Sequence, residues 1–143
     1  MRFWDSSAVV PLVVAERASA TMAALTTAGL PMYVWWGTRT EVAAALARLE
    51  RLGHATPASI SECSRRLRDL AASWRELAPS ELLRDSAERL LRAHDLQATG
   101  SLQLAAARIA TADDPSMAEF VCLDAKLRQA AAREGFRLLP VRL

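Results

Sequence analysis

The sequence has little lysine, which limits what can be concluded from its positive charge. Only one of the 18 basic side chains, Lys126, is a lysine, so nearly all of the positive charge is arginine. Guanidinium groups suit forked contacts with phosphate or carboxylate, although a GC-rich coding sequence produces the same bias. With 16 acidic residues the net charge is only +2, which by itself does not indicate a nucleic-acid partner.

Cysteine is scarce, and long apolar runs are missing. The two cysteines, Cys63 and Cys122, are too few for a disulfide scaffold and lack the paired spacing of a zinc site. No apolar stretch approaches the ~20 residues of a membrane span, and Asp5, Ser6 and Ser7 interrupt any apolar core of a signal peptide. We therefore expect free thiols and a cytoplasmic protein without a membrane segment.

What remains is the composition of an ordinary globular protein. The chain has 143 residues, of which 52% are apolar and 24% charged, and only five are glycine. A chain of this length buries roughly two thirds of its unfolded surface without disulfides or a structural metal. The composition excludes disorder and collagen-like repeats. With no internal repeat and no long linker, residues 1–143 are expected to form a single domain.

Short apolar runs alternate with helical patterns along the chain, which is typical of a parallel α/β sheet. The predicted strands are Arg2–Trp4, Met32–Trp36, Phe120–Leu123 and Phe136–Val141. Apolar residues three and four positions apart predict helices between them. These helices are Thr40–Arg51, Glu81–Ala93, Thr99–Ala112 and Lys126–Arg133. The sequence thus predicts a small parallel sheet of four or five strands flanked by helices.

One further helical pattern runs from Ile60 to Leu77, with arginines on its other faces. It spans fewer than three heptads, so a helical hairpin or a contact between two copies is expected rather than a free coiled coil. Ser80 is the expected cap of the helix that follows, and Thr38 or Thr40 that of the helix before it.

Two carboxylates follow predicted strands. Asp5 comes directly after the first strand, and Asp124 follows Phe120–Leu123. In an open parallel sheet this edge forms the crevice where ligands bind, and Glu41, early in the helix after Met32–Trp36, reaches it too. Three carboxylates there would repel one another by as much as ~4 kcal/mol per pair at a separation of about 4 Å and an effective dielectric of about 20. A cation such as Mg²⁺ or Mn²⁺ relieves this repulsion.

Each acid also has a purely structural explanation. Asp5 and Asp124 can cap the helices that follow them, and a glutamate in a first helical turn, such as Glu41, is favoured by the helix dipole. Spacing alone leaves both interpretations open.

The residues around these acids resemble a known family. The segment Phe3–Val13 is similar to the first strand and helix of PIN domains, specifically of the VapC-type toxins of bacterial toxin–antitoxin pairs. Thr38–Arg48 is similar to the second motif of the family, and Phe120–Leu127, followed by Ala-Ala and Gly135, to the last. The motifs stand in the expected order and cover essentially the whole chain.

The resemblance implies a PIN-like fold and a Mg²⁺- or Mn²⁺-dependent endoribonuclease toxin that a cognate antitoxin protein holds inactive. Asp5, Glu41 and Asp124 would be the catalytic metal ligands, directly or through water, and the metal would lower the pKa of a bound water. Ser6 or Ser7 would orient the Asp5 carboxylate, unless both only cap the helix. RNA as substrate and a homodimer, with residues 60–77 as a candidate contact, are also implied.

One position departs from the family's pattern. Gly100 stands where the penultimate helix of the family has an aspartate, and Gln103 stands where histidine is common. Asp95, on the preceding loop, is a candidate substitute. Because Mg²⁺ often binds through one or two carboxylates, the three remaining acids can still hold one ion, whereas a two-metal site is harder to sustain.

Because of Gly100, the sequence is compatible with more than one function. The chain is either a weakened metal-dependent ribonuclease or a catalytically degenerate PIN domain that binds an antitoxin or RNA without cleavage. A purely structural α/β module is the third alternative.

Trp35 and Trp36 can stack bases, but consecutive strand residues point to opposite faces, so at least one is expected in the core.

Overall fold

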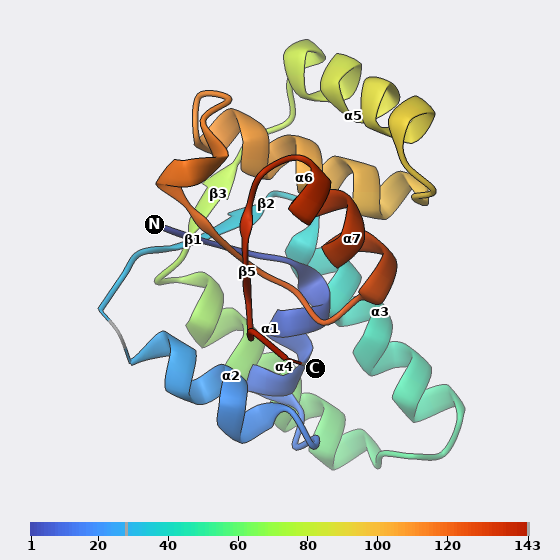
Figure 1. Ribbon diagram of the computed structural model, residues 1–143. Helices are drawn as coiled ribbons and strands as arrows, with labels where there is room; N and C mark the ends of the chain where they lie inside the picture. The colour runs from blue at the N-terminus through green and yellow to red at the C-terminus, as the bar shows by residue number, and fades with distance from the viewer. Residues whose placement is uncertain (28, 143) are drawn as a thin grey trace.

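The computed structural model describes residues 1–27 and 29–142, and its centre is a five-stranded sheet. The strands are β1 (Arg2–Trp4), β2 (Met32–Trp35), β3 (Arg75–Leu77), β4 (Glu119–Val121) and β5 (Arg137–Leu139). They lie in the order β3-β2-β1-β4-β5, and every neighbouring pair is parallel (Figure 1). The predicted parallel α/β sheet is confirmed, with the first strand of the chain in the middle.

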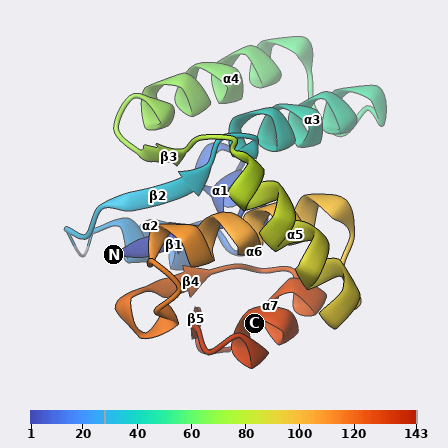
Figure 2. The ribbon, with the colours of Figure 1, turned by 90° about the horizontal axis from the view of Figure 1, so that it is seen from above.

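Seven α-helices connect the strands within the described ranges. They are α1 (Ser6–Val13), α2 (Ser19–Thr26), α3 (Thr38–Arg51), α4 (Pro57–Ala71), α5 (Glu81–Ala93), α6 (Ala98–Ala110) and α7 (Ala125–Arg133). Figure 1 shows α5 and α6 on one face of the sheet and α1, α2 and α4 on the other. Figure 2 shows the α3–α4 hairpin beyond the β3 edge. None of these helices is long and apolar enough to cross a membrane.

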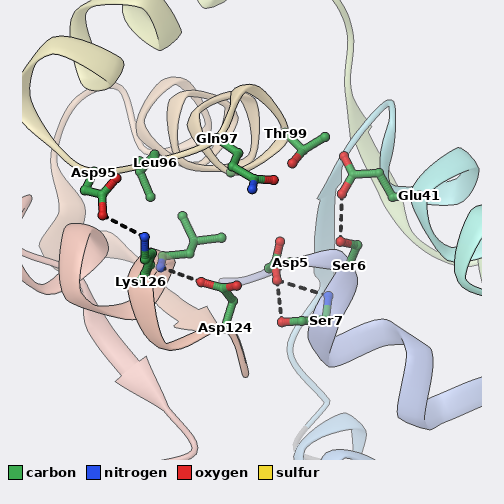
Figure 3. Close-up of a pocket in the computed structure, with 12 residues that line it drawn as sticks. Asp5, Ser6, Ser7, Glu41, Asp95, Leu96, Gln97, Thr99, Asp124 and Lys126 are labelled. Carbon is green, nitrogen blue, oxygen red and sulfur yellow. Dashed lines mark hydrogen bonds and ion pairs between the residues drawn. The ribbon is translucent and has the colours of Figure 1, made fainter.

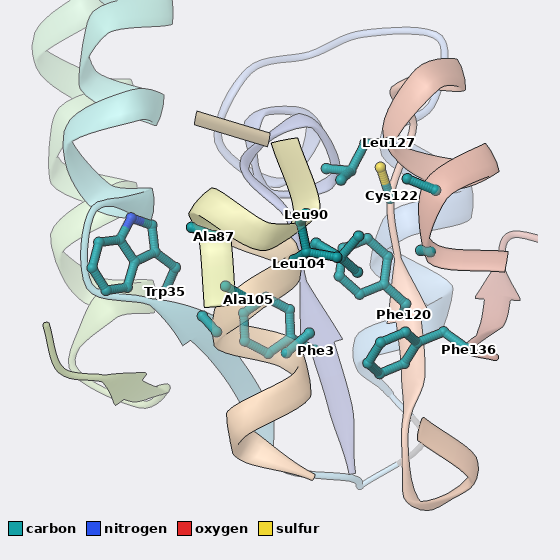
Figure 4. Packing of buried hydrophobic residues seen from close by; sticks show 14 of the residues in the cluster. Phe3, Trp35, Ala87, Leu90, Leu104, Ala105, Phe120, Cys122, Leu127 and Phe136 are labelled. Atoms are coloured by element: carbon teal, nitrogen blue, oxygen red, sulfur yellow. The ribbon is translucent and has the colours of Figure 1, made fainter. Parts of the chain in front are cut away.

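Alternation along the strands divides the core between the two faces of the sheet. Phe3 and Phe120 pack against α5, α6 and α7, whereas Trp4 and Val121 pack against α1 to α4. Figure 4 shows the first cluster, in which the stacked rings of Phe3 and Phe120 have centroids 5.7 Å apart. Burial on both faces explains why the last two residues of β1 and of β4 are apolar, whereas each strand begins with a charged residue, Arg2 or Glu119.

The spacing of apolar residues over Ile60–Leu77 predicted one continuous helix, but the segment does not form one. α4 ends at Ala71, and the last three residues form the edge strand β3, paired with β2. Leu67 and Trp74 are buried in the chain's own core, so the interpretation as a helical hairpin is confirmed. The apolar face of this segment is largely used inside the chain, and the contact between two copies stays a prediction.

The helix caps are only partly as predicted. Ser80 caps α5 by accepting a 3.1 Å hydrogen bond from the Leu83 amide, as expected. α3, however, begins at Thr38 after Gly37, and no side chain caps it, so the prediction of Thr38 or Thr40 as its cap was wrong. Thr38 is instead fully buried, because its hydroxyl has a partner in the core.

Candidate active site

The carboxyl ends of β1 and β4 open onto a pocket of about 290 Å³ (Figure 3). Asp5 and Asp124 line it because Trp4 pairs with Val121 in parallel and the residues after both strands reach the same edge. Glu41 lines it from the first turn of α3. The rest of its lining is Ser6, Ser7, Asp95, Leu96, Gln97, Thr99, Gly100, Lys126 and Leu127. The acids thus lie where the strand ends predict, and their metal-binding role stays a prediction.

Asp5 is buried, with only 4% of its surface exposed, and it caps α1. Its Oδ2 accepts hydrogen bonds from the Ser7 amide at 3.0 Å, the Ser7 hydroxyl and the Cys122 thiol at 3.5 Å. Burial raises the pKa of Asp5, the hydrogen bonds from Ser7 and Cys122 oppose this, and the charge of Asp124 raises it further. From the described residues no hydrogen bond reaches the other oxygen, Oδ1.

Asp124 repeats this arrangement at the end of β4. Its Oδ1 caps α7 by accepting a 2.7 Å hydrogen bond from the Leu127 amide. Across residues 1–27 and 29–142, Oδ2 accepts none. The capping and metal-binding interpretations are therefore compatible, since each aspartate caps a helix with one oxygen and has the other available for a ligand.

Glu41 is held from two sides. Its Oε2 accepts a 2.7 Å hydrogen bond from the Ser6 hydroxyl and a 3.1 Å hydrogen bond from the Gln103 amide. Burial raises the pKa of Glu41, these hydrogen bonds oppose it, and the charge of Asp5 adds to the increase. Of the two serines expected to orient Asp5, Ser7 does so, whereas Ser6 holds Glu41.

Gln103 and Cys122 are pocket-supporting residues that the sequence did not reveal in these roles. Gln103 is 1% exposed, and besides Glu41 it contacts the Thr38 hydroxyl at 3.1 Å. A glutamine inside the alanine- and leucine-rich α6 was the available signal, because a buried amide needs hydrogen-bond partners. The Cys122 thiol is buried, which raises its pKa and makes it a hydrogen-bond donor rather than a nucleophile.

Gly100 is the third residue of α6 and lines the pocket. A Cβ at this position would lie 3.7 Å from Leu96 and 3.8 Å from Leu127, which are ordinary contacts. Packing therefore does not require glycine here. Asp95, the candidate substitute for an acid at this place, also lines the pocket, but its carboxylate is paired at 2.7 Å with the Lys126 ammonium (Figure 3).

The donors fit a partly hydrated divalent cation. Asp5, Asp124 and Glu41 each have one carboxylate oxygen that accepts no hydrogen bond in the part of the chain that the structure describes. Within the same part, no group of three or more His, Cys, Asp or Glu residues forms a ready-made metal cage. Mg²⁺ commonly keeps several waters and uses one or two carboxylates, so this donor set suits it.

No family model and no curated protein matches the sequence. Solved structures nevertheless share the fold. A chain in the crystal structure of FitAcB from Neisseria gonorrhoeae aligns with a TM-score of 0.67 and 13% identity over 96% of each chain. A chain in a toxin–antitoxin complex from Klebsiella pneumoniae aligns with a TM-score of 0.63 and 14% identity over 88% of each chain. At these identities the likeness is one of fold, and it is consistent with the expected PIN-like α/β architecture.

Proposed function

We propose that this chain is a Mg²⁺- or Mn²⁺-dependent endoribonuclease toxin that pairs with an antitoxin protein. The observation that carries the proposal is the pocket at the ends of β1 and β4, where Asp5, Glu41 and Asp124 each have a carboxylate oxygen without a hydrogen bond from the described residues. The fold shared with a chain of a toxin–antitoxin complex supports the antitoxin as partner. The homodimer expected from the sequence is part of the same proposal.

Asp5, Asp124 and Glu41 would hold the ion, directly or through water. The metal would supply a water of lowered pKa and offset charge at the scissile phosphate. The protein fixes the ligands beforehand: Ser7 holds the Asp5 carboxylate, and Ser6 holds that of Glu41. Such positioning matters because loss of a single outer partner of a metal ligand commonly costs 10–100-fold in affinity or activity.

The test is cleavage of single-stranded RNA across a range of Mg²⁺ and Mn²⁺ concentrations, with a chelator as reference. Cleavage should require metal and should be lost in Asp5→Asn, which removes the charge but keeps the shape of the side chain. Asp85→Asn, a matched change at an exposed acid on α5, should cleave like the wild type. Absence of metal-dependent cleavage by the wild type at every concentration would reject the ribonuclease function.

Gly100 favours a second candidate function, that of a degenerate PIN-like domain which binds an antitoxin or RNA without cleaving it. The position has room for a side chain, yet it supplies no carboxylate to the pocket. Under this alternative the wild type binds RNA but does not cleave it, and Gly100→Asp gains metal-dependent cleavage. Under the first proposal the wild type already cleaves, and Gly100→Asp only increases the rate.

A further inference from the structure

Trp36 is 56% exposed, whereas the other three of the four tryptophans are buried. It directly follows β2, at the sheet edge that carries the acidic pocket. Two separate hollows, of about 410 Å³ and about 390 Å³, both have Trp36 in their lining. The indole therefore stands between two open spaces, as a surface on which a flat group can lie.

The position of Trp36 is fixed by its neighbours. Its amide donates a 3.0 Å hydrogen bond to the Leu77 carbonyl in β3. Its ring meets that of the buried Trp35 edge to face, with centroids 6.3 Å apart and planes at 68°. Gly37 makes room for this pair, because a Cβ there would lie 2.4 Å from Trp35 Nε1. The exposed ring is thus part of a Trp35–Trp36 platform that contacts within the chain hold in place.

The platform is one helical turn from the pocket. The Glu41 amide donates a 3.0 Å hydrogen bond to the carbonyl of Gly37, the residue after Trp36. Arg39 lies in this turn, is exposed, and lines the smaller hollow together with Trp36. Among the described residues Arg39 makes no ion pair, whereas Arg84 in the larger hollow is paired with Glu81 at 2.8 Å. The available cation beside the indole is therefore the guanidinium of Arg39.

We propose that Trp36 and Arg39 form a subsite for single-stranded RNA outside the acidic pocket, in which a base stacks on the indole and a neighbouring phosphate pairs with the guanidinium. This subsite rests on the proposed function for its substrate. Stacking on an aromatic ring accepts any base, and an adjacent cation follows the backbone. The smaller hollow favours RNA over an apolar peptide segment, because it is lined by Trp36, Arg39, Thr40, Ala43 and Glu76 and has no aliphatic side chain larger than alanine.

The test is binding of a single-stranded RNA of about eight nucleotides in the presence of a chelator, so that no cleavage occurs. Affinity is measured from the anisotropy of a fluorescently labelled RNA, and in the wild type quenching of the exposed Trp36 gives a second readout. Trp36→Phe keeps an aromatic face and should bind nearly as well as the wild type. Trp36→Leu keeps apolar bulk without that face and should bind roughly 5- to 150-fold more weakly. Melting temperatures of both variants verify that they are folded.

Arg39→Ala should weaken binding and reduce the salt dependence of the affinity by about one released ion. Arg17→Ala, at an exposed arginine between α1 and α2, is the matched control and should leave both quantities unchanged. Equal RNA affinity of Trp36→Leu and Trp36→Phe would overturn the proposal. So would loss of self-association or of antitoxin binding in Trp36→Leu while its RNA affinity stays that of the wild type, because the surface would then belong to a protein partner.

Failure of the proposed function is distinguishable from failure of this subsite. Binding in chelator that depends on the Trp36 ring, without cleavage at any metal concentration, would support the subsite and reject the ribonuclease. Metal-dependent cleavage, together with an RNA affinity that substitution of Trp36 or Arg39 leaves unchanged, would support the ribonuclease and reject the subsite.

Discussion

The side-chain amide of Gln103 donates a 3.1 Å hydrogen bond to Oε2 of Glu41 from inside the core, where Gln103 is 1% exposed. The two residues are 62 positions apart in the chain. A buried amide thus joins α6 to the first turn of α3, and the position of one acid in the pocket depends on the packing of a helix that is distant in the sequence.

Gln103→Leu should weaken both the fold and the pocket. It removes the amide that donates to the buried Thr38 hydroxyl and to the Glu41 carboxylate, which keeps only the Ser6 hydroxyl, and the free energy of unfolding should fall by about 1–3 kcal/mol. Metal-dependent cleavage should fall by roughly 10–100-fold. Leu104→Met on the same helix is the control, with a stability loss below about 1.5 kcal/mol and wild-type cleavage. Full activity in Gln103→Leu would contradict the positioning role.

Asp5→Asn should make the metal-free protein more stable while it removes metal binding. Burial raises the pKa of Asp5, which shows that its charge is unfavourable in the folded state. An asparagine oxygen can still accept the 3.0 Å hydrogen bond from the Ser7 amide. In chelator the variant should therefore have a higher Tm than the wild type, and Mn²⁺ should raise only the Tm of the wild type. A lower Tm of Asp5→Asn in chelator would contradict this.

The same burial predicts how stability changes with pH. Because the pKa of Asp5 is raised in the folded state, the folded protein binds more protons between the ordinary and the raised pKa. The contribution of Asp5 to the free energy of unfolding must then fall as the pH rises through that window. Glu41 contributes in the same direction, whereas Glu119 and Glu134, whose pKa values are lowered, contribute in the opposite one.

The quantity to measure is therefore the difference between the wild type and Asp5→Asn, from urea unfolding in chelator at a series of pH values. The advantage of the variant should grow as the pH rises through the window and then become constant. An advantage that shrinks with rising pH would show that the Asp5 charge is stabilised in the metal-free protein.

Gly100→Asp should strengthen metal binding without disturbing the fold. The new Cβ would have ordinary contacts of 3.7 and 3.8 Å, and an acid in the first turn of α6 is favoured by the helix dipole. Mn²⁺ affinity, measured by calorimetry, should rise. Gly100→Ala, the matched control, should stabilise the helix by up to about 1 kcal/mol and leave the affinity unchanged. Equal Mn²⁺ affinity in the two variants would exclude this position from the metal site.

Gly37→Ala should destabilise the fold, in contrast to Gly100→Ala. A Cβ at Gly37 would lie 2.4 Å from Nε1 of Trp35, so the buried indole must shift. Overpacking of this kind typically costs about 1–3 kcal/mol. The readouts are the Tm and the near-ultraviolet circular dichroism of the tryptophans. A Tm equal to that of the wild type would mean that the Trp35 ring adapts at no cost.

The sequence predicted the sheet well where strands are buried on both faces. The run that includes Phe120 has apolar side chains on both faces of β4, because helices cover both faces. Asp124 marks the end of this run. β3 escaped prediction because Arg75 and Glu76 are exposed on an edge strand, and the neighbouring Trp74 continues the helical spacing of α4.

The acids of the pocket were predicted, but their supporting contacts were not. A position after a strand is a local property, which is why Asp5 and Asp124 can be found by spacing alone. The choice of Ser6 for Glu41, and of Ser7 for Asp5, depends on how α3 approaches α1. That approach is set by long-range packing, and so is the pairing of Gln103 with Glu41.

The central place of β1 in the sheet determines when the pocket can form during synthesis. β1 pairs with β2 on one side, but on its other side Arg2 lies opposite Glu119, which is translated 117 residues later. At about 5–20 residues per second, Asp124 leaves the peptidyl-transferase centre roughly 6–24 s after Asp5. A nascent chain without β4 has the first acid of the pocket but not the last. If the chain is the ribonuclease toxin proposed above, its pocket stays incomplete until β4 is made, and an antitoxin would need to act only on finished molecules.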